Sequence, residues 1–263
     1  MSGPDASDAS PPLVEVTGIA KHYGGVVAIE EVDLDIRQGE TLGLIGPNGS
    51  GKTTLVNVLS GFVPPTAGAL TIQGEAKRFL PPQKALVRYG FARTFQNIRL
   101  GRSMTAEENI LVGMHHSFRP WSTVLPGGGP AERRARQTAE ELLELVGIAH
   151  LRNRLAGQLS YGDQRRVEIA RALATKPRLV MLDEPAAGMN PREAEGLIVL
   201  LQHIAKGRTL LLIEHNMSVV MQIADRVAVL DAGRRIALGL PRDVVDNPLV
   251  KEAYLGKRRA HVS

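Results

Sequence analysis

Along the first ninety residues, hydrophobic and polar positions follow the spacing typical of strands. Alternation on both sides of the Gly24-Gly25 turn predicts a hairpin, and short apolar runs follow it. Strands are predicted over residues 13–19, 26–36, 41–45 and 69–73. Helical spacing over 51–59 interrupts them, so the pattern up to about residue 93 predicts mostly β-structure around one helix.

From about residue 95 to 175 the apolar positions take the spacing of amphipathic helices. Helices are predicted over residues 105–114, 131–146 and 161–175. The stretch 115–130, HHSFRPWSTVLPGGGP, separates the first two helices and is rich in Pro and Gly, which predicts an exposed loop.

After Pro177 short apolar strands alternate with helices. Strands are predicted over 179–183, 209–214, 226–230 and 234–238, with helices over 192–204 and 217–223 and two short helices at the end. This alternation is typical of a mostly parallel sheet in an α/β fold. The chain therefore combines a β-rich start, a helical insertion and an α/β core built from both ends.

Composition narrows the classes of protein that fit this pattern. The 263 residues include no Cys, which excludes disulfides and thiolate metal sites. The net charge is +5, but 4% aromatic residues leave no stacking platform for nucleic acid. Residues 1–11 lack the basic flank and apolar run of a signal peptide and are predicted to be a disordered tail. Apolar runs fall short of the ~18 residues of a membrane span, so we expect any work at a membrane to go through a partner.

A phosphate-binding loop lies between the strand at 41–45 and the helix that follows. Residues 46–53, GPNGSGKT, fit the pattern G-x-x-x-x-G-K-[ST] in this strand–loop–helix setting. Its glycines let backbone N–H groups turn towards phosphate oxygens, Lys52 reaches the β- and γ-phosphates, and the Thr53 hydroxyl can ligate Mg²⁺. The loop predicts a nucleoside triphosphate site, but GTPases, kinases and motor ATPases share it.

Acidic and polar residues follow the later strands. Asp183 ends a buried strand, where it can hold Mg²⁺, and Glu184 is free to orient and deprotonate the attacking water. His215 follows the next strand and can hydrogen-bond the γ-phosphate, with Glu214 as a weaker rival for a catalytic role. Gln96 is a candidate to contact Mg²⁺ and the water through its amide, although the residues alone leave its role open.

The quintet LSYGD at 159–163 opens the third helix of the insertion. Ser160 suits an N-cap and Gly162 permits close backbone approach, so the helix start can bind a phosphate. The phosphate loop already serves the chain's own nucleotide. The length of the helix, roughly 22 Å, favours a nucleotide held by a second subunit, unless the next strand runs back alongside the helix.

These segments together resemble the ATP-binding subunit of an ABC transporter, over about residues 12–256. The resemblance implies a P-loop ATPase core (12–94 and 177–256) with an antiparallel β subdomain, an inserted helical subdomain (95–176) and a basic C-terminal tail (257–263). It also implies ATP and Mg²⁺ as cofactors and a head-to-tail dimer of identical or different ATPase subunits. Two ATPs would lie between the phosphate loop of one subunit and the signature turn of the other.

The resemblance also implies roles for the residues of this chain that match the family's motifs. Nucleotide contacts are implied for Tyr23, which would stack on adenine, and for Gly46, Pro47, Asn48, Gly49, Ser50, Gly51, Lys52, Thr53, Thr54, Ser160, Tyr161, Gly162 and Asp163. Metal contacts are implied for Thr53, Gln96 and Asp183, and catalytic roles for Glu184, His215 and Gln96. The usual signature is L-S-G-G-Q, so Tyr161 and Asp163 depart from it. A carboxylate would repel phosphate, and we expect Asp163 to face a ribose hydroxyl or solvent.

Further strings resemble the ATPases of branched-chain amino-acid importers: RTFQNIRL, MTAEENILVGMH, DEPAAGMNP, LLIEHNM and EAYLG. ATPases for urea and other amides and the lipopolysaccharide exporter ATPase are similar alternatives, and non-transport ABC ATPases are a further one. The resemblance implies membrane permease subunits, with a groove at residues 96–100 where Ile98 and Leu100 contact a short helix of the permease. It also implies a place at the cytoplasmic face of the membrane and an indirect partner, an extracytoplasmic substrate-binding protein.

Overall fold

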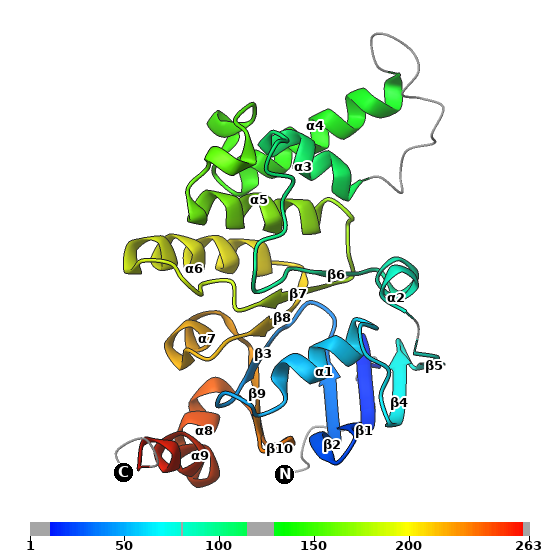
Figure 1. The fold of residues 1–263 in the computed structure, drawn as a ribbon, viewed down its shortest axis with the longest axis vertical. Helices are drawn as coiled ribbons and strands as arrows, with labels where there is room; N and C mark the ends of the chain where they lie inside the picture. Colours follow the sequence, from blue (N-terminus) through cyan, green and yellow to red (C-terminus); the bar gives the residue numbers. More distant parts are fainter. Residues whose placement is uncertain (1–10, 80, 115–128, 260–263) are drawn as a thin grey trace, which may run out of the picture.

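The computed structural model describes residues 11–79, 81–114 and 129–259 (Figure 1). The strands are β1 (Val14–Tyr23), β2 (Val26–Ile36), β3 (Thr41–Ile45), β4 (Ala67–Ile72), β5 (Glu75–Lys77), β6 (Phe91–Arg93), β7 (Leu179–Asp183), β8 (Thr209–Ile213), β9 (Arg226–Asp231) and β10 (Arg234–Gly239). The α-helices are α1 (Lys52–Leu59), α2 (Pro82–Tyr89), α3 (Ala106–Gly113), α4 (Pro130–Leu145), α5 (Tyr161–Leu173), α6 (Pro191–Ala205), α7 (Met217–Ile223), α8 (Pro241–Asp246) and α9 (Pro248–Arg259), with short 3₁₀ turns at Ala149–Leu151 and Ala156–Gln158.

The strands form two sheets. The first has the order β2-β1-β4-β5 and is antiparallel. The second has the order β10-β9-β3-β8-β7-β6, in which only the edge strand β10 runs antiparallel to its neighbour. The fold is therefore α/β with a mostly parallel core sheet and a separate antiparallel sheet, as the sequence predicts.

Alternate residues of the core strands pack against different layers. In β8, Leu210 and Leu212 join the apolar core under helices α3 to α7. Leu211 and Ile213 join the core shared with α1 and the antiparallel sheet. Both faces of the sheet are covered, which is why its strands read as continuous apolar runs rather than alternating ones. In Figure 1 the two layers lie on opposite sides of β3, β8 and β7.

The parallel direction of the core strands decides where the functional segments lie. Strands β6, β7, β8 and β3 are neighbours and point the same way. The segments that follow them therefore leave the sheet at one edge, where open α/β sheets bind their ligands. Those segments are 94–96, 183–184, 214–215 and 46–53.

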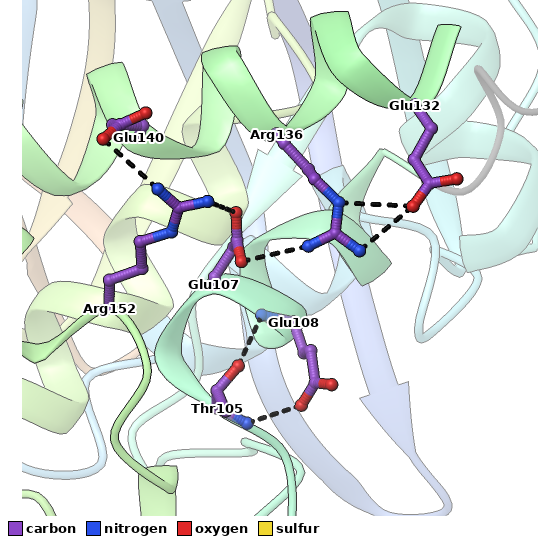
Figure 2. Close-up of polar contacts among 7 residues, drawn as sticks. All are labelled: Thr105, Glu107, Glu108, Glu132, Arg136, Glu140 and Arg152. Carbon is purple, nitrogen blue, oxygen red and sulfur yellow. Dashed lines mark hydrogen bonds and ion pairs between the residues drawn. The ribbon is translucent and has the colours of Figure 1, made fainter. Parts of the chain in front are cut away.

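The helices of the insertion are held together by an ion-pair network, drawn in Figure 2. Glu107 is 5% exposed. Its Oε2 accepts from Arg136 of α4 at 3.2 Å, and its Oε1 accepts from Arg152 at 2.8 Å. At the start of α3, Thr105 and Glu108 form a reciprocal capping box. One buried carboxylate thus joins α3, α4 and the end of the 3₁₀ turn at Ala149–Leu151.

Three elements differ from the sequence-based expectation. Helix α2 and strands β5 and β6 were not expected, so residues 74–93 hold more structure than a β-region around one helix. Strands β5 and β6 have three residues each, too few to show a period. Residues 257–259 of the predicted basic tail continue α9. The predicted loop at 115–130 falls mostly outside the described residues, as do residues 1–10 of the predicted disordered tail and residues 260–263.

Among the described residues, none of the helices combines the length and the apolar character needed to cross a bilayer.

Candidate nucleotide site

The phosphate loop joins β3 to α1 and its backbone is compatible only with glycine at several points. Gly46 has φ +152° and Gly51 has φ +101°. A Cβ on Gly46 would lie 2.1 Å from the carbonyl oxygen of Leu230, and one on Gly51 would lie 2.6 Å from Cγ2 of Ile29. These close approaches and dihedral angles require glycine, and the loop backbone lies directly against β9 and β2.

Side chains of this loop fit a triphosphate. Nζ of Lys52 donates to the carbonyl oxygens of Gly46 and Pro47, at 2.8 and 3.0 Å, so the ammonium group lies across the loop. Ser50 is buried, and its hydroxyl has no hydrogen-bond partner within the part of the chain that is described. Buried hydroxyls are normally paired. An orphaned hydroxyl beside a lysine and a helix N-terminus therefore fits an anionic ligand.

Asp183 ends β7 and is held from the neighbouring strand. It is 5% exposed, and Arg93 donates to its Oδ2 at 2.8 Å. The backbone N–H of Asp183 donates to Oγ1 of Thr94 at 3.2 Å. The Arg93 guanidinium also donates to Oδ1 of Asn57 at 2.7 Å and to Oγ of Ser60 at 2.9 Å. Arg93 thus compensates the buried carboxylate and ties β6 and β7 to helix α1.

Glu184, Gln96 and His215 converge at the same edge. Nε2 of Gln96 donates to Oε2 of Glu184 at 3.1 Å, and Nδ1 of His215 lies 3.9 Å from that oxygen. Glu184 adopts φ +44°, an uncommon conformation for a residue with a side chain. Strained backbone of this kind is enriched at functional sites. The side chains of Gln96 and His215 thus lie beside the Glu184 carboxylate, which suits a water-activating group.

Glu214 also lies near His215, whose Nδ1 is 3.9 Å from its Oε2, but its carboxylate is buried. It is 1% exposed, and its Oε1 accepts from the backbone N–H of Ala186 at 3.3 Å. Burial raises the pKa of Glu214, with the Ala186 N–H opposing the shift. A buried carboxylate bonded to the chain's own backbone is less available to water than Glu184, which favours Glu184 as the base.

The signature turn begins α5. Oγ of Ser160 caps the helix by accepting from the N–H of Asp163 at 3.1 Å, and Ser160 also hydrogen-bonds Oδ2 of Asp163 at 2.7 Å. The Asp163 carboxylate therefore engages the cap, in an exposed hydrogen bond, and its expected orientation towards a ribose hydroxyl or solvent stays a prediction. Tyr161 is 40% exposed and its ring lies beside Gly188. Gly162 is buried next to Glu193 of α6.

The remaining predicted residues are exposed or half-buried. Tyr23 ends β1 with 47% of its surface exposed, and Nζ of Lys21 lies 5.0 Å from its ring centroid. Thr53 is exposed in the first turn of α1, and Asn48 and Gly49 are exposed in the loop. Ile98 and Leu100 are half-buried, and Leu100 packs against the core under the helices.

Three residues near the site escaped the sequence interpretation. Arg93 and Arg165 are charged residues within otherwise ordinary strings, and only the pairing of β6 with β7 and the packing of α5 reveal their partners. Tyr254 of α9 lies near the first glycine of the phosphate loop. Burial raises the pKa of Tyr254 to about 12, and the neighbouring backbone of Gly46 partly offsets this.

Few of the described side chains are placed to ligate a metal ion. Among the described residues no group of three or more His, Cys, Asp or Glu side chains is placed to hold a metal ion. Mg²⁺ in nucleotide sites is usually held by one or two carboxylates together with phosphates and waters. The oxygen donors Asp183 and Thr53 suit that arrangement.

A sequence model of the family described as ABC transporter matches residues 29–187, more than half of the chain. The chain belongs to the ABC transporter family. A second model, described as branched-chain amino acid ATP-binding cassette transporter, matches residues 234–260, the region of β10, α8 and α9. As a member of the ABC family, the chain is an ATP-binding cassette that hydrolyses ATP.

Curated relatives of this ABC ATPase extend over almost the whole chain. It is 44% identical to the high-affinity branched-chain amino acid transport ATP-binding protein BraF of Pseudomonas aeruginosa, covering 94% of this chain and 99% of the relative. LivG of Salmonella typhimurium, with the same description, shows the same identity and coverage. The probable LivG of Methanocaldococcus jannaschii is 34% identical over 93% of this chain and 98% of that relative.

Solved structures share the fold. The ADP conformation of an ATP-binding cassette of an ABC transporter has a TM-score of 0.81 at 33% identity, covering 93% of this chain and 98% of that one. A dimeric post-hydrolysis state of a cassette bound to ADP and Pi has a TM-score of 0.73 at 26% identity, covering 87% and 99%.

Proposed function

We propose that this chain is the ATPase subunit of an importer of branched-chain amino acids and works at the cytoplasmic face of the membrane through permease subunits. The observation that carries the ATPase mechanism is the convergence of residues 46–53, 94–96, 183–184 and 214–215 at one sheet edge. The substrate class rests on the identity to BraF and LivG and on the match of residues 234–260. An extracytoplasmic substrate-binding protein would deliver the amino acid.

Binding of MgATP follows from the geometry of the loop. Backbone N–H groups of residues 46–53 and the ammonium of Lys52 would hold the phosphates, after Lys52 exchanges its bonds to the Gly46 and Pro47 carbonyls for phosphate oxygens. Thr53, Asp183 and Gln96 would hold Mg²⁺, which when bound offsets the charge of the phosphates. Tyr23 would stack on the adenine.

Hydrolysis is assigned to Glu184. Its carboxylate would take the proton of the attacking water, while Gln96 and His215 orient that carboxylate. The turn Ser160–Gly162 would cover the nucleotide of a second ATPase subunit. The hydroxyl of Ser160 would then exchange its bond to Asp163 for one to a phosphate oxygen.

The ATPase assignment is tested with Glu184→Gln. Because the amide cannot accept the proton, we expect hydrolysis to fall by roughly 100-fold or more, while ATP binding persists and the variant forms an ATP-dependent dimer in size-exclusion chromatography. Glu214→Gln is the matched control, since Glu214 follows the neighbouring strand but is buried, and it should hydrolyse ATP within a few-fold of the parent. Full turnover by Glu184→Gln, or its loss in Glu214→Gln, would overturn the assignment.

The substrate class is tested separately. The chain would be reconstituted in liposomes with its permease subunits and binding protein, and uptake of leucine compared with uptake of urea. ATP-dependent leucine uptake is the expected result. Urea uptake without leucine uptake would transfer the chain to the amide transporters and leave the ATPase assignment standing.

A further inference from the structure

A fully buried arginine connects the signature turn to the segment that carries Gln96. Arg165 lies one helical turn into α5 and is 0% exposed. Its NH1 donates to the carbonyl oxygen of Phe95 at 2.7 Å, and its NH2 donates to the carbonyl oxygen of Gln96 at 2.8 Å. Two adjacent peptide carbonyls are thus held by one planar guanidinium.

The other bonds of Arg165 fix its own orientation. NH1 also donates to Oε2 of Glu168 at 2.6 Å, and NH2 donates to the hydroxyl of Tyr161 at 3.2 Å. Both partners belong to α5, so the guanidinium is anchored on its helix before it reaches the loop. A buried charge is costly unless it is paired. NH1 and NH2 each have two partners, whereas Nε has none among the described residues, so the four bonds of NH1 and NH2 fix the guanidinium.

The position of the Arg165 guanidinium matters because Gln96, whose carbonyl it binds, also contacts the proposed base Glu184. The carbonyl of Gln96 binds Arg165, and its side-chain amide donates to Oε2 of Glu184 at 3.1 Å. Gln96 itself is exposed. Arg165 of α5 thus holds the backbone of Gln96, and a shift of that carbonyl moves the amide relative to Glu184.

Tyr161, which stands where the usual signature has glycine, contacts the Arg165 guanidinium. Its hydroxyl is a fourth acceptor for the guanidinium, and the ring centroid lies 5.9 Å from the guanidinium carbon. Glycine in that place has neither an acceptor nor a ring. The pair Tyr161 and Arg165, four residues apart on one helix face, thus links the residue after Ser160 to the backbone of Gln96.

We propose that Arg165 is a positioning residue for ATP hydrolysis. It sets the distance between Gln96 and Glu184, and through Tyr161 it connects the Gln96 backbone to the signature turn. The inference rests on the proposed ATPase mechanism and adds to it a residue that contacts neither nucleotide nor water.

The first test is Arg165→Lys. Lysine keeps a charge for Glu168 but, as a single ammonium group on a shorter reach, cannot serve both carbonyls and the tyrosine hydroxyl. We expect kcat for ATP to fall on the order of ten-fold, because misplacement of a catalytic group by about 1 Å is costly. KM should stay within about two-fold, since the phosphate loop and Tyr23 are unchanged. Tyr161→Phe removes one bond and should lower kcat in the same direction by less.

A double-mutant cycle shows whether Arg165 acts through Gln96. If it does, Arg165→Lys should add almost nothing to Gln96→Ala, because the group it positions is already absent. Arg166→Lys is the matched control, since the NH1 of Arg166 donates to the carbonyl oxygen of Val146 at 2.6 Å, away from the Gln96 loop. In the double variant Arg166→Lys, Gln96→Ala, the fold-decrease in kcat should equal the product of the two single-variant decreases.

Multiplying effects of Arg165→Lys and Gln96→Ala would overturn the inference, and so would a change in KM alone. If Arg165→Lys does not fold, the double variant Arg165→Met, Glu168→Gln removes the buried pair as a unit, and the same cycle decides. The Glu184→Gln dimer separates the two proposals. If that dimer forms but the cycle is multiplicative, the ATPase assignment stands and the role of Arg165 fails.

Discussion

Arg93→Met tests how much of the stability at the sheet edge comes from one buried cation. The side chains of Arg93 and Asp183 are 3% and 7% exposed. The substitution removes the donors to Asp183, Asn57 and Ser60 and leaves the carboxylate without its compensating charge. Breaking a buried pair from one side costs about 3–5 kcal/mol. For a domain of this size that corresponds to a fall in Tm of roughly 6–20 °C.

Urea unfolding followed by circular dichroism measures this cost. The double variant Arg93→Met, Asp183→Asn removes both charges, so we expect it to recover at least about 2 kcal/mol of the loss. Arg242→Met is the surface control, because the Arg242 and Asp243 side chains are 81% and 65% exposed, and it should change the unfolding free energy by less than about 0.5 kcal/mol. Equal losses in the single and double variants would show that shape, and not the compensation of Asp183, explains the effect.

Two further predictions concern the phosphate loop and the contact between the sheets. Gly46→Ala should abolish binding of a fluorescent ATP analogue, since its Cβ would lie 2.1 Å from the carbonyl oxygen of Leu230, whereas Gly129→Ala, at φ −68° with nothing within 4 Å of its Cβ, should bind normally. Arg226 lowers the pKa of Asp35 below 3.8 through hydrogen bonds from NH1 and NH2, at 2.8 and 2.9 Å. Asp35→Asn should therefore cost about 1 kcal/mol at neutral pH, and this difference should disappear as the pH falls below 3.8 through the lowered pKa.

The sign of the last effect is fixed by linkage. A carboxyl group whose pKa is lowered by folding binds fewer protons in the folded state, so its stabilisation is complete above pH 3.8 and is lost in acid. The exposed Asp243 supplies the comparison, and Asp243→Asn should give a pH profile parallel to that of the parent. A cost of Asp35→Asn that persists unchanged at low pH would assign the contact between β2 and β9 to packing rather than charge.

Local patterns predicted most of the elements well. Strand β3 and strand β7 have the bounds that their apolar runs indicate, and α1, α3 and α5 begin within a residue of the Gly, Thr and Ser that precede them. These elements carry their own start and stop signals in adjacent residues. The same patterns did not predict α2, which begins at the second residue of the Pro81-Pro82 pair, or the three-residue strands β5 and β6, which form only by pairing with neighbouring strands.

The candidate site divides in the same way. The amino-acid sequence alone determined the phosphate loop, the paired acids after a buried strand and the capped helix start at Ser160, because each is a contiguous string whose chemistry is local. Only the tertiary structure decided what those strings touch: the Arg93 guanidinium on Asp183, the Asp163 carboxylate on Ser160, and Arg165 on the carbonyls of Phe95 and Gln96. These contacts join residues brought together by parallel strand pairing and helix packing, or depend on which way a side chain turns within its own cap. A buried charge is costly unless it is paired, so each of the buried charges needs a partner. The neighbouring residues in the sequence do not indicate which partner that is, because the partner comes from a distant segment.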